Sequence, residues 1–261
     1  MEGGTAPGDK RLLVLGAGPA QLGLLEAAHD RGLYVIAVDR DPAAPVERFV
    51  LISSSEVYGT AESDPMDEEH PLSPRSPYAA TKAGADRLAY SYYVTYGLPI
   101  VILRPFNNYG PRQHWEKVVP RFITSALSDE TLTVHGDGHA SRDWLYVMDD
   151  AEALVAAIEA ERDTVAGEVI NVATGVDVSV SDIADLVLDL LGKPRSLKAH
   201  VDERPGQVDR HIGSTDKASR LLGWRARTSF AEGLERTVAW YRENEAWWRG
   251  ARHQVTSGYS S

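Results

Sequence analysis

A glycine-rich turn follows the first apolar run of the chain, in the stretch Arg11-Leu-Leu-Val-Leu-Gly16-Ala-Gly18-Pro-Ala-Gln-Leu-Gly23. We expect a buried strand over residues 11–15, a helix over residues 20–31 and a second strand over residues 33–38. Such a strand–helix–strand unit uses its glycines to let the backbone approach a phosphate. Gly16, Gly18 and Gly23 are therefore predicted cofactor contacts, and Asp39 lies where it can bond a ribose hydroxyl. The alternatives are a packing turn and a strand-end cap.

The rest of the chain continues to alternate strands with helices. This order predicts an α/β fold with a mainly parallel sheet. The main elements are expected at 49–53 (strand), 78–97 (helix), 99–104 (strand), 149–160 (helix) and 169–173 (strand). Shorter elements in the second half predict a small lobe over the carboxyl ends of the strands, where ligands of such folds bind. They are expected at 118–127, 181–191 and 230–250 (helices) and at 132–135 and 144–147 (strands).

The composition is that of an ordinary globular protein. The 261 residues include 27 Lys and Arg against 38 Asp and Glu, a net charge of −11, and 43% are hydrophobic. The negative net charge argues against a protein whose main function is to bind nucleic acid. The chain has no cysteine and no apolar run of about 18 residues, so we expect no disulfide, no metal site, no membrane-spanning helix and a cytoplasmic location. Residues 1–10 and 251–261 are expected to be flexible tails.

The spacing of a tyrosine and a lysine gives the strongest sign of chemistry. Tyr78 and Lys82 share one face of the expected helix because residues four apart are neighbours on its surface. A lysine ammonium beside a phenol favours the phenolate and lowers its pKa, which makes a general base. Ser54, at a strand end, can hydrogen-bond the same substrate hydroxyl. The alternative is a chance spacing on a surface helix.

A series of motifs occurs in order along the chain. It resembles the extended short-chain dehydrogenase/reductases, the NAD-dependent epimerase/dehydratase family that acts on nucleotide sugars. The resemblance covers residues 49–248 and implies a Rossmann-like sheet with a small C-terminal α/β substrate lobe. The motifs are Ser53-Ser-Ser-Glu-Val-Tyr-Gly59, Ser76-Pro-Tyr78-Ala-Ala-Thr-Lys82, Arg104-Pro-Phe-Asn-Asn-Tyr-Gly-Pro-Arg-Gln113, Arg142-Asp-Trp-Leu-Tyr-Val147, Arg204-Pro-Gly206 and Leu222-Gly-Trp224.

The resemblance implies a role for each matching residue. Tyr78 takes the proton of the sugar C4 hydroxyl. Lys82 adjusts the pKa of the Tyr78 phenol and holds the nicotinamide ribose, and Ser54 is the Ser/Thr partner of Tyr78 at the same hydroxyl. Hydride passes from C4 to NAD, which gives a 4-keto sugar. The nucleotide sugar, UDP- or dTDP-linked, is held by Asn107, Asn108, Arg142 and Arg210. Glu116 and Lys117 resemble a substrate-contacting pair of dTDP-glucose 4,6-dehydratases.

The step after oxidation stays open in the sequence. The dTDP-glucose dehydratases have an Asp-Glu pair where this chain has Ser55 and Glu56. Glu56 can remove a proton, but Ser55 is a poor proton donor. A 4,6-dehydratase is the first interpretation, and a 4-epimerase or a decarboxylase is the alternative.

The N-terminal part departs from the family. Its glycine turn resembles the domain that precedes ATP-grasp domains, and only residues 40–48 separate Asp39 from the next strand. The family carries about two more strand–helix units there. We therefore expect a truncated nucleotide-binding domain of residues 11–107 with 140–174, and a substrate lobe of residues 108–139 with 175–250.

Without the missing helices, one apolar face of the sheet lacks a packing partner. Such a face favours contact with a second chain, so we expect a homodimer. The missing units also leave open a different class of function, a sugar-nucleotide-binding protein that has lost NAD binding and catalysis.

Overall fold

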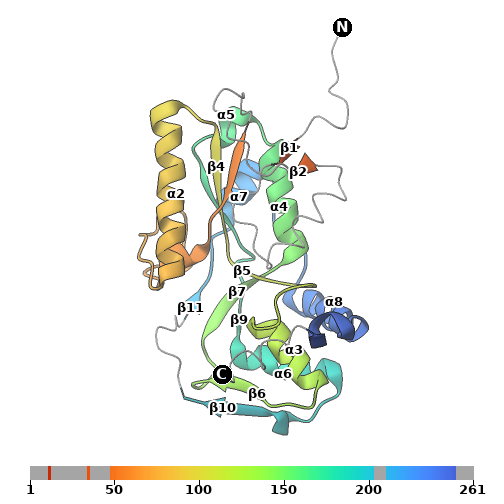
Figure 1. Ribbon diagram of the computed structural model, residues 1–261. Helices are drawn as coiled ribbons and strands as arrows, with labels where there is room; N and C mark the ends of the chain where they lie inside the picture. Colours follow the sequence, from red (N-terminus) through yellow and green to blue (C-terminus); the bar gives the residue numbers. More distant parts are fainter. Residues whose placement is uncertain (1–10, 13–33, 36–47, 203–209, 251–261) are drawn as a thin grey trace, which may run out of the picture.

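The computed structural model describes residues 11–12, 34–35, 48–202 and 210–250 (Figure 1). Its central sheet has the strand order β3-β4-β8, formed by Phe49–Ile52, Ile100–Pro105 and Val169–Val172. Both neighbouring pairs are parallel. The predicted parallel α/β sheet is therefore confirmed, with each of the three strands within about one residue of its expected bounds.

The two faces of this sheet are covered by different helices. Helix α2 (Pro77–Tyr96) lies on one side, and α4 (Val147–Glu159) and α7 (Asp216–Leu222) lie on the other (Figure 1). Side chains alternate between the faces because successive strand residues point in opposite directions. The α2 face buries Leu51, Ala89, Ile100 and Ile102. The opposite face buries Val50, Ile52, Val101 and Leu103, together with three alanines and Leu154 of α4.

Helix α2 is well capped but hardly buried. The Ser76 hydroxyl accepts a hydrogen bond from the Ala79 backbone N–H at 3.1 Å, and Pro77 occupies the first turn, where its missing N–H costs nothing. Gly97 ends the helix in the left-handed conformation, with φ of 68°. Among its 20 residues, only Ala79, Asp86 and Ala89 are buried.

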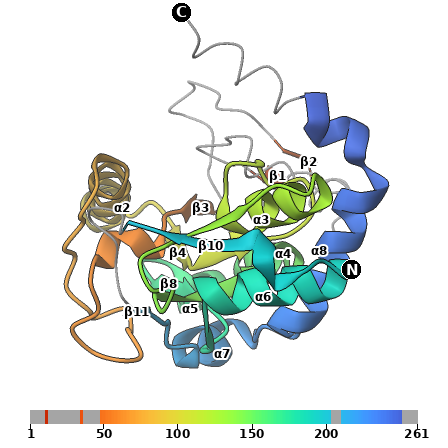
Figure 2. The ribbon, with the colours of Figure 1, turned by 90° about the horizontal axis from the view of Figure 1, so that it is seen from below.

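A second core lies beyond the carboxyl ends of the central strands. Helices α3 (Val118–Leu127), α6 (Val180–Leu191) and α8 (Phe230–Glu243) pack together there with β6 (Leu132–His135) and β10 (Lys198–Val201) (Figure 1; the three helices and β10 are seen from below in Figure 2). The core that they form with the following helical turn buries Phe122, Ile123, Leu188, Tyr241 and Trp248. The expected bounds of α3 and β6 are confirmed. The expected C-terminal helix is interrupted by a turn at residue 244.

A small mixed sheet joins the two cores. Strands β5 (Asn107–Tyr109) and β11 (Arg210–His211) both pair in parallel with β7 (Ser141–Tyr146), and β9 (Asp177–Ser179) pairs antiparallel with it. The two asparagines, one glycine and two prolines of residues 105–113 predict a loop, and this prediction is wrong for residues 107–109, which form β5. Its Asn-Asn-Tyr sequence forms a strand because β7 supplies the backbone partners.

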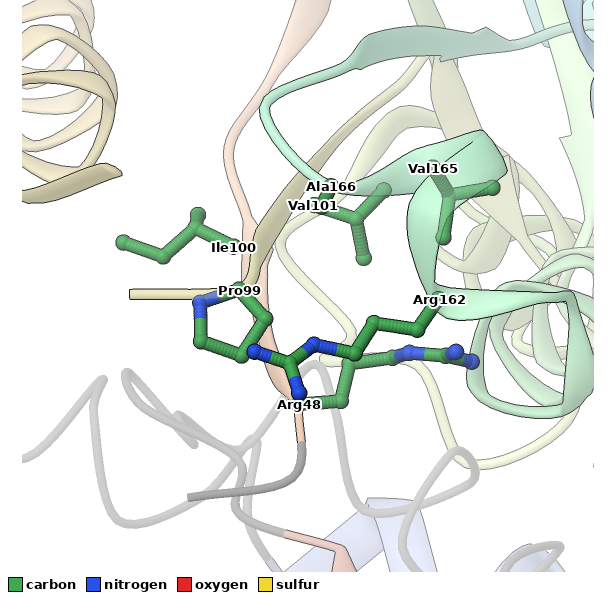
Figure 3. A pocket seen from close by; sticks show the side chains of 7 residues that line it. All are labelled: Arg48, Pro99, Ile100, Val101, Arg162, Val165 and Ala166. Carbon is green, nitrogen blue, oxygen red and sulfur yellow. The ribbon is translucent and has the colours of Figure 1, made fainter. Parts of the chain in front are cut away.

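An arginine fastens the start of β3 to the end of α4. The Arg48 guanidinium donates to the carbonyls of Ala157 at 2.8 Å and Ala160 at 2.5 Å, and also to that of Ile158. These are carbonyls that a helix end leaves without partners, and the cation also suits the negative end of the helix dipole. Figure 3 shows Arg48 beside Arg162 of α5 (Arg162–Val165), at the rim of a small pocket against Pro99 and Val101.

Two short strands are described in the N-terminal part. β1 (Arg11–Leu12) and β2 (Tyr34–Val35) pair in parallel, in the register Arg11 with Tyr34 and Leu12 with Val35. Within the described residues they form a sheet of their own and do not pair with β3. The rest of the expected strand–helix–strand unit, the link at 40–47 and the two expected tails lie outside the described residues. In the parts that are described, no helix combines the length and the apolarity needed to cross a membrane.

Candidate functional site

Three segments converge at the carboxyl edge of the central sheet. β3 leads into a short 3-10 helix, η2 (Ser55–Tyr58), whose N-cap Ser54 accepts a hydrogen bond from the Glu56 N–H at 3.2 Å. β4 leads through Phe106 into β5, and β8 leads into Ala173. Phe106 and Ala173 pack together with Tyr58 in one buried cluster. The strand ends are therefore held side by side, as expected for a binding edge in this class of fold.

The structure brings Ser54, Glu56, Tyr78 and Lys82 together at this edge. The Tyr78 side chain, 56% exposed, lies in the first turn of α2 and is hydrogen-bonded to the Ser54 side chain. Glu56 is close enough for its charge to act on the Tyr78 phenol. Lys82 lies one turn further along and donates from Nζ to the Ile52 carbonyl at 3.0 Å. A phenol, a carboxylate and an ammonium thus lie around the end of β3.

The proton affinity of Tyr78 differs from the sequence prediction. Burial raises the pKa of the phenol, and the charge of Glu56 raises it further, while the hydrogen bond with Ser54 lowers it. Burial also lowers the pKa of the Lys82 ammonium. The predicted lowering of the Tyr78 pKa by Lys82 is wrong for this structure, because Lys82 bonds the Ile52 carbonyl and Glu56 is the charge that acts on the phenol.

Asn107 and Asn108 lie on β5, which pairs directly with β7, the strand that carries Arg142. The Asn108 amide donates to Asp150 Oδ2 at 2.6 Å. Burial raises the pKa of Asp150 to about 6, against the opposing effect of this bond. The side-chain oxygens of Asn107 and Asn108 are buried without a hydrogen-bond partner. Such oxygens are costly unless something donates to them, so they mark a place for a ligand donor.

Arg142 and Arg210 lie on the neighbouring strands β7 and β11, where Arg142 stands opposite His211. Arg142 donates to the Ser141 carbonyl at 2.9 Å. Arg210 is half exposed and forms ion pairs with Asp64 and with Asp177, the latter at 3.2 Å.

The other predicted contacts stand apart from this group or lie outside the described residues. Glu116 is exposed and pairs with His114 at 3.5 Å, and Lys117 is exposed at the N-cap of α3. Gly16, Gly18, Gly23 and Asp39 lie outside the described residues, so their predicted cofactor contacts stay predictions.

Several buried polar residues beside the site were not predicted. Asp143 accepts hydrogen bonds from the backbone N–H groups of Thr174 at 2.9 Å and Gly175 at 2.8 Å, and so fixes the loop after β8 to β7. His211 is buried against the Phe106 ring, and burial, followed by the charge of Arg142, lowers its pKa to about 4. Asp143 lies within the motif Arg142–Val147, which could have marked it, whereas His211 lies outside the quoted motifs.

Three more of these residues form one connected group: Asp86, Arg104 and Tyr58. Asp86 repeats the four-residue spacing of Tyr78 and Lys82, and Tyr58 and Arg104 lie within the motifs Ser53–Gly59 and Arg104–Gln113, but no sequence pattern indicates that the three side chains meet.

Within the described parts of the chain, no group of three or more His, Asp or Glu side chains is arranged to hold a metal ion.

Comparison with known proteins gives consistent matches. The model of the GDP-mannose 4,6 dehydratase family matches residues 17–237. A dTDP-glucose 4,6-dehydratase of Actinoplanes sp. is 41% identical over 203 residues, which are 78% of this chain and 62% of that protein. The chain spans about three fifths of the length of the curated relatives that it matches. The family match begins at residue 17 and so includes most of the glycine-rich segment, and the resemblance of that segment to an ATP-grasp N-terminal domain is not supported.

Solved structures agree with these matches. A dTDP-glucose 4,6-dehydratase of Streptomyces venezuelae, with NAD and TYD bound, has a TM-score of 0.76 and 34% identity, covering 92% of this chain and 76% of its own. A UDP-glucuronic acid 4-epimerase of Bacillus cereus, in complex with UDP-glucuronic acid and NAD, has a TM-score of 0.73 and 34% identity, covering 77% of this chain and 63% of its own. The Rossmann-like fold is therefore shared with dehydratases and epimerases alike.

Proposed function

Because the chain belongs to the GDP-mannose 4,6-dehydratase family of NAD-dependent epimerases and dehydratases, we propose that it oxidises a nucleotide sugar at C4 and completes a 4,6-dehydration. The observation that carries the proposal is the grouping of Ser54, Glu56, Tyr78 and Lys82 at the end of β3. It supplies a phenol hydrogen-bonded to a hydroxyl, a carboxylate and an ammonium. These are the groups that deprotonation of an alcohol and of an adjacent carbon requires.

The described part of the edge fits the nicotinamide end of NAD. The Ser53 hydroxyl is buried there without a hydrogen-bond partner, and Ser53 follows Ile52, whose carbonyl accepts from Lys82. Ser53 and Lys82 can both bond a ribose or an amide group, and Lys82 is the residue that we propose for the ribose hydroxyls. Bound NAD supplies the hydride acceptor for oxidation at C4 and the donor for the final reduction. Gly16, Gly18, Gly23 and Asp39 are proposed for the pyrophosphate and the adenine ribose.

The side chains divide the proton transfers among them. Tyr78, as phenolate, takes the proton of the C4 hydroxyl, and the Ser54 hydroxyl orients that oxygen. The 4-keto group then acidifies C5, and Glu56 takes the C5 proton. The C6 hydroxyl leaves as water with the proton that Glu56 returns. When C6 receives the hydride, C5 takes a proton from solvent, and the C4 proton held by Tyr78 passes to solvent, which restores the phenolate. Ser55 is 1% exposed, so it does not present a hydroxyl to the substrate, and Glu56 is the carboxylate that serves both transfers.

The substrate lobe is proposed to hold the nucleotide. Arg142 and Arg210 come from neighbouring strands, and a guanidinium can form two parallel charged bonds with a diphosphate. Arg210 would exchange its pairs with Asp64 and Asp177 for the phosphate oxygens. Asn107, Asn108, Glu116 and Lys117 are proposed for the sugar side. This assigns residues 11–107 with 140–174 to the cofactor, and residues 108–139 with 175–250 to the substrate.

We also propose a homodimer that covers helix α2. Leu88, Tyr92 and Tyr96 are 60%, 46% and 73% exposed, and their spacing of four places them in one stripe. An exposed stripe of large apolar side chains marks an interaction surface. A second copy of the chain fits because two such stripes can pack antiparallel against each other.

The function is tested with purified protein, NAD and a set of UDP-, dTDP- and GDP-sugars. A 4,6-dehydratase gives a product that has lost one water and carries solvent deuterium at C5 when the reaction runs in heavy water. An epimerase leaves the mass unchanged, and a decarboxylase removes carbon dioxide. Binding of a sugar nucleotide without binding of NAD, measured by calorimetry up to millimolar NAD, would support a non-catalytic binding protein instead.

Tyr78→Phe tests the role of the base. It removes only the hydroxyl, so turnover should fall by about 10² or more while the sugar nucleotide still binds. The matched control is Tyr90→Phe, a phenol on the same helix that is 40% exposed, and it should keep full turnover. Turnover by Tyr78→Phe at the wild-type rate would remove Tyr78 from this role.

A further inference from the structure

Helix α2 carries the proposed base but has few contacts that fix its position. Tyr78 and Lys82 lie near its start, and its buried residues are two alanines and Asp86. Apolar contacts such as that of Ala89 against the sheet are not directional, and the bond of Lys82 to the Ile52 carbonyl fixes α2 at one point only, so the helix can still rotate by small amounts. Asp86 lies on the same face as Tyr78 and Lys82, two turns after Tyr78.

Asp86 forms a two-pronged bond with an arginine of the sheet. Arg104, the next-to-last residue of β4, donates from Nε to Asp86 Oδ2 at 2.8 Å and from Nη2 to Oδ1 at 3.0 Å. Both side chains are buried, Arg104 being 2% exposed and Asp86 fully covered. Burial alone would raise the pKa of Asp86, but the bonds and the charge of Arg104, helped by Arg87, hold it below its usual range. Two parallel charged bonds fix direction as well as distance.

The same arginine connects to the segment that carries Ser54. Arg104 Nη1 donates to the Tyr58 hydroxyl at 2.9 Å, and the guanidinium carbon lies 4.8 Å from the centre of the Tyr58 ring. Tyr58 closes η2, the 3-10 helix that Ser54 caps, and its hydroxyl donates to Asn171 Oδ1 on β8 at 2.7 Å. One chain of bonds thus runs from α2 through β4 to η2 and β8.

We propose that Asp86, Arg104 and Tyr58 are positioning residues that hold Tyr78 of α2 against Ser54 and Glu56 of η2. This rests on the proposed role of Tyr78 as the base. Tyr78 and Ser54 belong to two elements, and the chain of bonds joins both elements to the same strand, β4. A buried ion pair often adds little to stability compared with apolar side chains of the same size, while it does select one arrangement. We therefore assign this pair to geometry rather than to stability.

The experiment replaces the pair by apolar side chains of similar size. Asp86→Leu combined with Arg104→Met leaves no unpaired charge in the interior, so the double variant should fold with a melting temperature close to that of the wild type. Its kcat should nevertheless fall by about tenfold or more with KM for the sugar nucleotide little changed, and the pH dependence of kcat should shift. Wild-type kcat and an unchanged pH profile in a folded double variant would overturn the proposal.

Tyr58→Phe covers the case in which the double variant does not fold. It removes the hydroxyl that Arg104 and Asn171 share and keeps the ring, so it should fold and should also shift the pH profile of kcat. An unchanged profile would overturn the proposal here too. The control is Thr237→Val, which removes a buried hydroxyl bonded to the Gly233 carbonyl on α8, in the second core. It should change neither kcat nor the profile.

A readout without turnover separates this proposal from the proposed function. The phenol of Tyr78 can be titrated by NMR of ¹³C-labelled tyrosine, with Tyr78→Phe giving the assignment. Loss of the network should move the Tyr78 titration even if no sugar is turned over by the wild type. A Tyr78 titration that is identical in the wild type, the double variant and Tyr58→Phe would overturn the positioning role.

Discussion

At the residue scale, burial raises the pKa of two tyrosines at the site, Tyr78 and Tyr58, and the two differ in exposure. Burial raises the pKa of Tyr78, which favours the neutral phenol in the absence of ligands. It raises the pKa of Tyr58 to about 12, because the effect of burial exceeds the opposing effect of Arg104. Tyr58 therefore stays protonated and can donate to Asn171, while Tyr78, which is more exposed, can exchange its proton with a substrate.

Asp150 gives a prediction on stability and pH. Its pKa is about 6 in the fold and 3.8 without it, so the folded chain binds more protons between these values than the unfolded chain does. The free energy of unfolding should therefore fall as pH rises from about 4 to 6, by up to about 3 kcal/mol at 1.36 kcal/mol per pKa unit, and then stay level. Asp150→Asn keeps an acceptor for Asn108 and loses this dependence. Relative to the wild type, it should gain about 2 kcal/mol between pH 4.5 and 7.5 in urea unfolding. Parallel curves for the two proteins would contradict this.

At the element scale, a glycine sets the exit of η2, the 3-10 helix beside the base. Gly59 has φ of 73°, and a Cβ there would meet the Ser73 carbonyl oxygen at 2.0 Å. Gly59→Ala should therefore lower the free energy of unfolding by at least about 2 kcal/mol. Gly84→Ala is the control, because nothing lies within 4 Å of its added Cβ and α2 is helical there. It should raise the free energy by about 0.5–1 kcal/mol in chemical denaturation. Equal effects of the two changes would refute this account.

The Arg48 cap on α4 gives a second prediction for an element. Arg48→Ala leaves the carbonyls of Ala157 and Ala160 without their donor, so the chain should lose about 1–2 kcal/mol of unfolding free energy. Arg162→Ala removes the neighbouring guanidinium in Figure 3, which is exposed, and should change the value by less than about 0.5 kcal/mol. Urea unfolding of both variants measures the difference. A loss of the same size in Arg162→Ala would point to the shared pocket rather than to the cap.

How far the sequence predicts each element depends on where its partners lie. The bounds of α3 and β6 follow from local pattern, since their own apolar spacing decides which face is buried. β5 and β11 have two or three polar residues and become strands only because β7 lies beside them, so no local pattern marks them. The site residues likewise divide into those found from local spacing and those that depend on packing between elements. Tyr78 and Lys82 are found from a spacing of four, whereas the bond of Asp86 with Arg104 joins two elements and depends on their packing.

At the scale of the whole molecule, the stripe of Leu88, Tyr92 and Tyr96 on α2 predicts the association state. The particle mass in solution should be twice 28.6 kDa. Leu88→Glu with Tyr92→Glu should reduce it to that of one chain, since burying two carboxylates in the contact is costly. Leu190→Glu, on α6 and 40% exposed, is the control and should leave the mass unchanged. Sedimentation velocity at micromolar concentration measures this, and a single-chain mass for the wild type would contradict the dimer.

The sparse burial of α2 also has a consequence for local opening. With Ala79, Asp86 and Ala89 as its buried residues, α2 can detach from the sheet without disturbing the second core. Its amide hydrogens should therefore exchange with solvent through a partial unfolding, at a lower free energy than those of α4, which buries six side chains. If a second copy covers the helix, this protection should rise with protein concentration, while that of α4 should not. Hydrogen exchange at two dilutions would then report how firmly the base is held before any substrate arrives.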